Sequence, residues 1–130
     1  MLRSTVICSA LLLAVACYHG PSLRTFQPAL RPDGIGAELQ LRDTTIAGEL
    51  LEVQDTALIV LTAGGVVVVP VAEIRRGIFA QRGPLLGEGI APQRPLAELR
   101  NLSRFPAGMT PEIRRRLLAA YGQTELQVAP

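Results

Sequence analysis

The chain has 130 residues, of which 48% are apolar, and its 13 basic and 11 acidic residues give a formal net charge of +2. This length predicts one small domain, and the apolar fraction excludes a wholly disordered chain. The small net charge excludes a strongly basic nucleic-acid-binding protein and an acidic tail protein. One His, two Cys and no Trp leave few side chains from which a catalytic site could be built.

The first 16 residues have the pattern of a secretory signal peptide. Arg3 supplies positive charge near the start, and the stretch from Thr5 to Ala16 is almost wholly apolar. Such a stretch is too short to cross a bilayer as a helix, which needs about 20 residues. A basic start, a short apolar run and the small-residue end Ala14-Val15-Ala16 are typical of a cleaved export signal. We therefore expect residues 1–16 to be removed.

The residues Leu13-Ala14-Val15-Ala16-Cys17 resemble a bacterial lipobox. In that family the Cys after the cleaved bond is diacylated and becomes the new N-terminus. The resemblance implies cleavage between Ala16 and Cys17 and attachment to a membrane through lipidated Cys17. Ordinary signal peptidase cleavage at the same bond, which leaves Cys17 unmodified, is the alternative. The residue after the Cys is Tyr18 and not Asp, which resembles the pattern of outer-membrane lipoproteins. The resemblance implies that the protein lies in the cell envelope and faces the periplasm.

Residues 17–34 are expected to be a tether between the anchor and the folded domain. Pro21, Pro28 and Pro32 interrupt this segment, and it shows no apolar periodicity. His19 lies here without a partner that could orient it for catalysis, so we assign it no catalytic role.

Residues 35–82 predict a mainly β domain, a small five-stranded barrel. Alternating apolar and polar residues, β-favouring runs and the Ala63-Gly64-Gly65 turn mark short strands that follow one another closely. Gly48 indicates a bulge or a close backbone approach. The expected strands are 37–42, 45–54, 57–62, 66–69 and 74–81. From the alternation we expect the core to include Leu39, Leu41, Ile59, Leu61 and Val67.

The same region resembles Sm-like and Src-homology-type barrels. The resemblance is carried by Gly48-Glu49-Leu50, Asp55 with Leu58–Leu61, Gly64-Gly65, and Val69-Pro70 followed by Ile74. It implies a small barrel of that type but no particular binding residue, because this fold hosts many unrelated roles. Nucleic-acid binding by an Sm-like protein is therefore an alternative function. The export signal disfavours it, because an exported chain does not meet RNA.

Residues 83–95 are expected to be a linker, since Gly and Pro recur through them, and residues 96–130 predict two short helices. Thr110 as N-cap, Pro111 in the first turn and Gly122 at the end mark the second helix. The apolar faces are Leu96, Leu99, Leu102 and Phe105 in the first helix and Ile113, Leu117, Leu118 and Tyr121 in the second.

Two expected strands, 57–62 and 66–69, are apolar on both faces. A barrel interior buries only one face of each strand, so the other face must be covered by something else. We expect the C-terminal helices to cover it. Pairing of this face with a second molecule is the alternative, and the oligomeric state is left open.

The sequence shows no catalytic or metal-binding constellation, so we expect no enzyme, no metal and no cofactor. It lacks a second His and a dense acidic group, and Ser22 and Ser103 have no evident base. Glu49 and Glu52 could face one another, but we interpret both as solvated strand positions. The run Arg114-Arg115-Arg116 is the candidate contact with anionic lipid or a partner, with a solvated helix face as the alternative.

These patterns together predict a lipid-anchored protein of the cell envelope. Its folded domain would act as a binding or scaffolding module for another envelope protein, and no nucleic-acid partner is expected.

Overall fold

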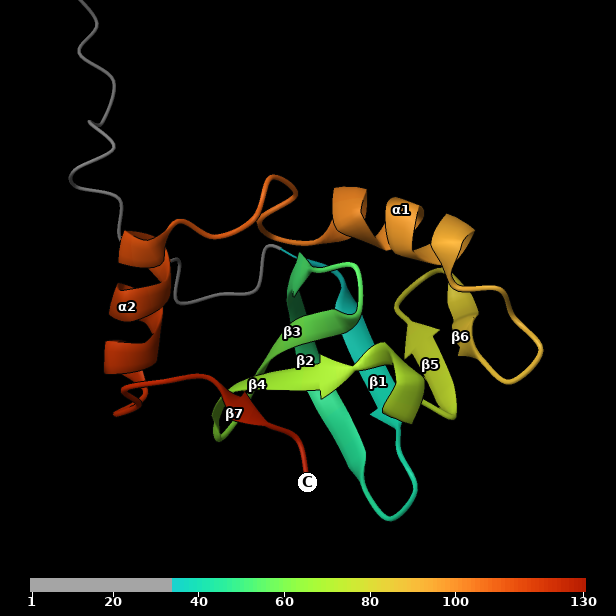
Figure 1. Cartoon of the computed structure of the whole chain (residues 1–130), viewed down its shortest axis with the longest axis horizontal. Coiled ribbons are helices and arrows are strands. Elements are labelled where there is room, and N and C mark those ends of the chain that lie inside the picture. Colours follow the sequence, from blue (N-terminus) through green and yellow to red (C-terminus); the bar gives the residue numbers. More distant parts are fainter. Residues whose placement is uncertain (1–33) are drawn as a thin grey trace, which may run out of the picture.

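Seven strands form one mixed sheet in the order β6-β5-β1-β2-β3-β4-β7 (Figure 1). The computed structural model describes residues 34–130, so the predicted signal peptide, Cys17 and the tether up to residue 33 lie outside the described residues. All strand pairs are antiparallel except β4 with β7, which is parallel. The strands are β1 (Gly36–Gln40), β2 (Thr45–Val53), β3 (Ala57–Thr62), β4 (Gly65–Pro70), β5 (Arg76–Phe79), β6 (Gly83–Gly87) and β7 (Gln127–Val128).

The mainly β fold is confirmed, whereas a five-stranded barrel is not. All five predicted strands are present, and they are neighbours in the order β5-β1-β2-β3-β4. Closing a barrel would require β4 to pair with β5. Within residues 34–130 their outer edges pair instead with β7 and β6, so the described sheet stays open.

The stretch 83–95 is not the linker that the sequence predicts. It contains β6, and α1 (Gln93–Leu102) begins before its end. The physical reason is Leu86, which is fully buried in the core of the sheet although Gly and Pro surround it in sequence. A tertiary contact therefore overrides the local turn signals.

Strand β2 is irregular in the part that pairs with β3. Its register with β3 shifts between Leu50 and Glu52, which is the local distortion that a bulge produces. Gly48 marks a close approach, as expected, because a Cβ there would overlap the carbonyl group of Leu61. Leu51 lies on the face of the sheet opposite to Leu50, as the alternation of side chains along a strand requires, and both side chains are fully buried.

The two faces of the sheet carry two separate apolar clusters. One, the α1 cluster, includes Leu96 and Leu99 of α1, and the other, the α2 cluster, includes Leu117 and Leu118 of α2 (Pro111–Ala120). The sheet contributes Leu39, Leu50, Leu58, Val60, Val69 and Phe79 to the α1 cluster and Leu51, Ile59 and Val66 to the α2 cluster.

The predicted core residues are divided between these clusters. Leu39, Leu41 and Ile59 are buried as expected, but Leu61 and Val67 are only half-buried. Ile59 also packs on the opposite face from Leu39, in the α2 cluster. Because β3 is apolar on both faces, its alternation alone could not show which residues point to which side.

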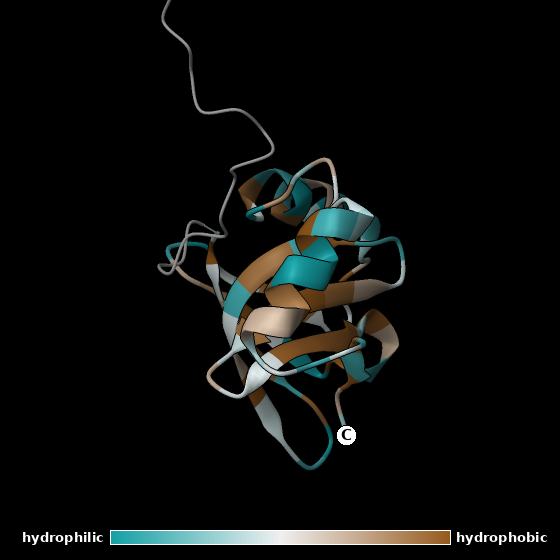
Figure 2. Cartoon of the chain, turned by 90° about the vertical axis from the view of Figure 1, so that its left-hand side faces the viewer, coloured by the Kyte–Doolittle hydropathy of each residue, from teal (hydrophilic) through white to brown (hydrophobic). Residues whose placement is uncertain are grey.

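The expectation that both helices cover one outer face is right for α2 only. Figure 2, viewed from the side of α2, shows this helix in front of the apolar strands. Its N-terminus is capped as predicted, since the Thr110 side chain accepts a hydrogen bond from the Ile113 N–H. In contrast, Leu96 and Leu99 of α1 pack into the opposite cluster, so the two helices enclose the sheet from both faces.

Candidate functional site

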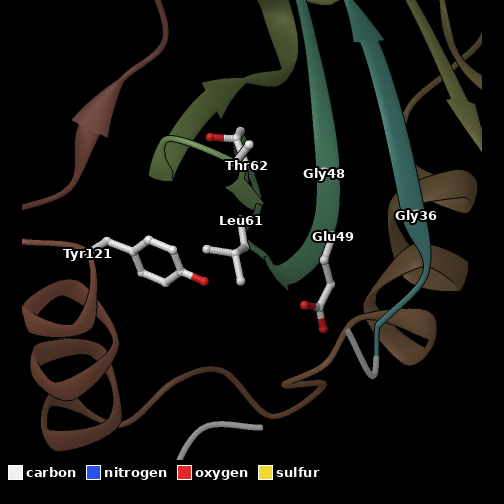
Figure 3. A pocket seen from close by; sticks show the side chains of 7 residues that line it. Gly36, Gly48, Glu49, Leu61, Thr62 and Tyr121 are labelled. Atoms are coloured by element: carbon white, nitrogen blue, oxygen red, sulfur yellow. The ribbon is translucent and has the colours of Figure 1, made fainter. Parts of the chain in front are cut away.

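A groove of about 310 Å³ lies between the C-terminal end of α2 and the β2–β3 pair. Figure 3 shows the ring of Tyr121 reaching toward Leu61, with Glu49 projecting from β2 on the other side. Tyr121 is 41% exposed and Leu61 is half-buried. The groove therefore has one aromatic and one aliphatic wall. Its lining residues are Gly36, Gly48, Glu49, Leu61, Thr62, Ala63 and Tyr121.

Two glycines are among the residues that line this groove. Gly36 in β1 and Gly48 in β2 belong to successive pairs of the β1–β2 register, where Gly36 faces Glu49 and Ala37 faces Gly48. Neither glycine carries a side chain that could fill the groove. At Gly48 the carbonyl group of Leu61 occupies the place of a side chain, so this glycine brings the β3 backbone to the groove.

Glu49 and Glu52, predicted to be solvated, are buried. Glu49 is 4% exposed and Glu52 is 8% exposed. The cause is the α1–α2 connector (103–110), which lies along the second half of β2. The connector is bonded to β2 through its backbone, since Arg104 N–H donates to the Leu50 carbonyl at 3.0 Å and Phe105 N–H donates to the Leu51 carbonyl at 2.9 Å.

The Glu49 carboxylate joins three parts of the chain. Its Oε1 accepts a hydrogen bond from the Gly34 N–H at 2.8 Å, and its Oε2 lies 3.5 Å from Nη1 of Arg104. The side chains of this ion pair are only 2% and 4% exposed. A carboxylate so far removed from water is tolerated because a cation and a donor compensate it. Glu49 thereby fixes the groove wall to the connector.

The Glu52 carboxylate contacts the other end of the connector. Its Oε2 accepts a hydrogen bond from the Met109 N–H at 3.0 Å and lies 3.7 Å from Nη2 of Arg114. Its Oε1 lies 3.4 Å from Nε2 of Gln54. Each carboxylate is thus engaged with its own cation, and this arrangement supports a structural role for both.

The predicted contact surface Arg114-Arg115-Arg116 does not form one patch of unpaired charge. Arg114 reaches inward to Glu52, whereas Arg116 pairs with Glu112 one turn earlier at 2.6 Å. Arg115 is exposed. Consecutive helix residues point in different directions, which explains why the run is divided. Its contact with lipid or a partner stays a prediction.

Within residues 34–130, no group of three or more His, Cys, Asp or Glu residues is placed to hold a metal ion. The Ser103 hydroxyl, a candidate nucleophile considered above, is buried and donates a hydrogen bond to the Arg100 carbonyl at 2.7 Å. Over the same residues, no helix is both long and apolar enough to cross a bilayer. Cys17 and His19 lie outside the described residues.

The sequence does not predict the groove, because its patterns assign Leu61 and Tyr121 to buried faces and Glu49 to a solvated strand position. Tyr121 was expected on the buried face of the second helix, but it is the residue that follows α2 and its side chain is largely open to solvent. Glu49 and Leu61 lie on strands that pair with one another, and only the fold brings Tyr121 to them.

No family model, curated protein or solved structure matches the chain.

Proposed function

We propose that this protein is a lipid-anchored protein of the cell envelope whose folded domain is a binding module for another envelope protein. The anchoring part of the proposal is supported by the export pattern of residues 1–16 and by Cys17 directly after the cleavage point. The observation that carries the binding part is the open groove between Tyr121 and Leu61.

The size and lining of the groove suit a side chain of a protein partner. Its volume is at the lower end of the range of about 300–1,000 Å³ found for small-molecule pockets. Exposed Tyr residues are enriched at protein interfaces, where the ring provides apolar area and the hydroxyl remains hydrated. The buried pair of Glu49 and Arg104 holds the groove wall in one position, which reduces the entropy lost on binding.

The same proposal includes the finer fold assignment. In it, β1–β5 follow the strand arrangement of an Sm-like barrel but form an open sheet, with β6 and β7 at its two edges. Support comes from the neighbour order β5-β1-β2-β3-β4 and from the short 3-10 helix (Val71–Glu73) between β4 and β5. Gly64-Gly65, quoted above for the resemblance, lies at the β3–β4 turn.

The anchor is tested by mass spectrometry and detergent phase separation of the full chain. We expect loss of residues 1–16 and added acyl mass on Cys17, and Cys17→Ser should move the protein from the detergent phase to the aqueous phase. Cys8→Ser is the matched control, because Cys8 lies in the removed segment and its loss should change neither result. An unmodified wild-type chain in the aqueous phase would refute the anchor.

The groove is tested by placing a photo-cross-linking amino acid in the full chain in intact cells. Ala63 at the groove and Ala97 on α1 are both exposed alanines, so they form a matched pair. We expect a discrete protein adduct from position 63 and none from position 97. Tyr121→Ala should then reduce the adduct from position 63. Equal adducts at both positions, or none at either, would contradict binding at the groove.

A further inference from the structure

The outer edge of β4 is covered by the C-terminal segment (123–130). Within this segment β7 runs parallel to β4, with Gln127 opposite Val67 and Val128 opposite Val68. The Ala129 N–H then donates to the Val68 carbonyl at 2.8 Å. An uncovered strand edge presents unpaired N–H and carbonyl groups that can pair with another chain. The C-terminal segment therefore occupies a position that another strand could take.

One side chain of this segment makes the hydrogen bonds to β4 that the backbone of a neighbouring strand would otherwise make. Oε1 of Gln123 accepts a hydrogen bond from the Val66 N–H at 2.8 Å, and Nε2 of Gln123 donates to the Val66 carbonyl at 3.0 Å. Both main-chain groups of Val66 are thus satisfied by one amide. Gly65 makes this approach possible, because a Cβ at Gly65 would lie 3.0 Å from Cδ of Gln123. The edge therefore recognises an amide side chain as well as a backbone.

β7 itself lies on the edge without being buried, whereas Leu126 and Ala129 on either side of it are half-buried against the α2 cluster and the α1 cluster. β7 has two residues, both are exposed, and Val128 is 66% exposed. Parallel pairing is also slightly less stable per residue than antiparallel pairing. Few buried contacts and short pairing place β7 among the parts of a fold that open at low free energy.

A cavity of about 600 Å³ lies next to the end of β4. It is lined on one side by the β1–β2 turn (41–44), on another by Pro70 and Glu73, and on the third by Val128–Pro130. The cavity therefore offers room next to Pro70 for a side chain of a bound strand.

We infer that the edge of β4 is an acceptor site for an extended strand of a partner polypeptide, and that the C-terminal segment occupies this site until the partner displaces it. The partner strand runs parallel to β4, carries an amide side chain that meets Val66, and pairs with Val67 and Val68 as β7 does. Its affinity is reduced by the competing segment, which is present at the high effective concentration of a short tether. This site is separate from the groove at Tyr121, so each can fail without the other.

The probe for the test is a fluorescent peptide with the sequence of residues 123–130, titrated by anisotropy against the full chain in detergent. Gln123→Ala removes both side-chain hydrogen bonds to Val66. The C-terminal segment of this variant therefore competes less strongly for the edge of β4, and the variant should bind the peptide about tenfold more tightly than the wild type does. Gln127→Ala is the matched control: Gln127 is exposed and its pairing uses the backbone, so binding should stay within about twofold of wild type. Equal affinity of the wild type and Gln123→Ala, or no binding to either, would overturn the inference.

A second measurement uses the wild-type chain and does not depend on the folding of a variant. Excess unlabelled peptide should accelerate hydrogen exchange of the Ala129 amide, because displacement removes its acceptor at Val68. Exchange of the Ile59 and Val60 amides in β3 should not change, since those strands remain paired. An Ala129 exchange rate that is unaffected by peptide, or that rises together with the β3 amides, would overturn displacement.

Discussion

Removing the cation from the buried pair beneath the groove should destabilise the domain strongly. Arg104→Met keeps a long apolar side chain but removes the positive charge beside Glu49. The side chain of Glu49 is 2% exposed, and the hydrogen bond from the Gly34 N–H to its carboxylate remains. Breaking a buried ion pair from one side typically costs about 3–5 kcal/mol. Since small domains have total stabilities of about 5–15 kcal/mol, this loss would remove a large part of the free energy of unfolding.

Urea unfolding of the full chain, followed by far-UV circular dichroism, measures this cost. Arg116→Met is the matched control, because its partner Glu112 is exposed and such a helix pair contributes only about 0.3–0.5 kcal/mol. The double variant Arg104→Met with Glu49→Gln also removes the buried negative charge, so it should recover at least about 1 kcal/mol of the single loss.

Two results would refute this reasoning. A loss below about 1 kcal/mol for Arg104→Met would mean that water or another group compensates Glu49. A double variant that is as unstable as the sum of the two single variants would mean that Glu49 and Arg104 are not coupled.

Four further substitutions, one of them a control, test the packing and the helix cap by the same unfolding measurement. Ile59→Ala should cost about 2–5 kcal/mol, because it empties a fully buried position between β3 and α2, and a loss below about 0.5 kcal/mol would contradict that placement. Gly48→Ala should cost at least about 2 kcal/mol, because the added Cβ would overlap the β3 backbone. Its control Gly64→Ala, in the open turn, should change the stability by no more than about 0.5 kcal/mol. Equal effects of the two substitutions would refute the close crossing of β2 and β3. Thr110→Ala should cost about 1 kcal/mol by removing the N-cap of α2, and an unchanged stability would show that the cap is dispensable.

The sequence alone was sufficient for the local elements. Period-2 alternation and glycine turns located all five strands of the central sheet, because side chains on a strand point alternately to its two faces. Thr110 and Pro111 located the start of α2, because capping depends on residues within one turn. The export pattern is equally local, and its consequences stay predictions.

Arrangements that depend on residues far apart in the chain required the tertiary structure. The sequence could not show that Glu49 is buried, because its burial is produced by Arg104 and the connector, 55 residues further along. It could not divide β3 between two clusters, because both faces of that strand are equally apolar and only the docking of α1 and α2 on opposite faces distinguishes them. The groove at Tyr121 has the same origin, since it exists only where the end of α2 meets β2 and β3. Patterns with a short period report which element forms, whereas the site is created by contacts between elements, which a period does not encode.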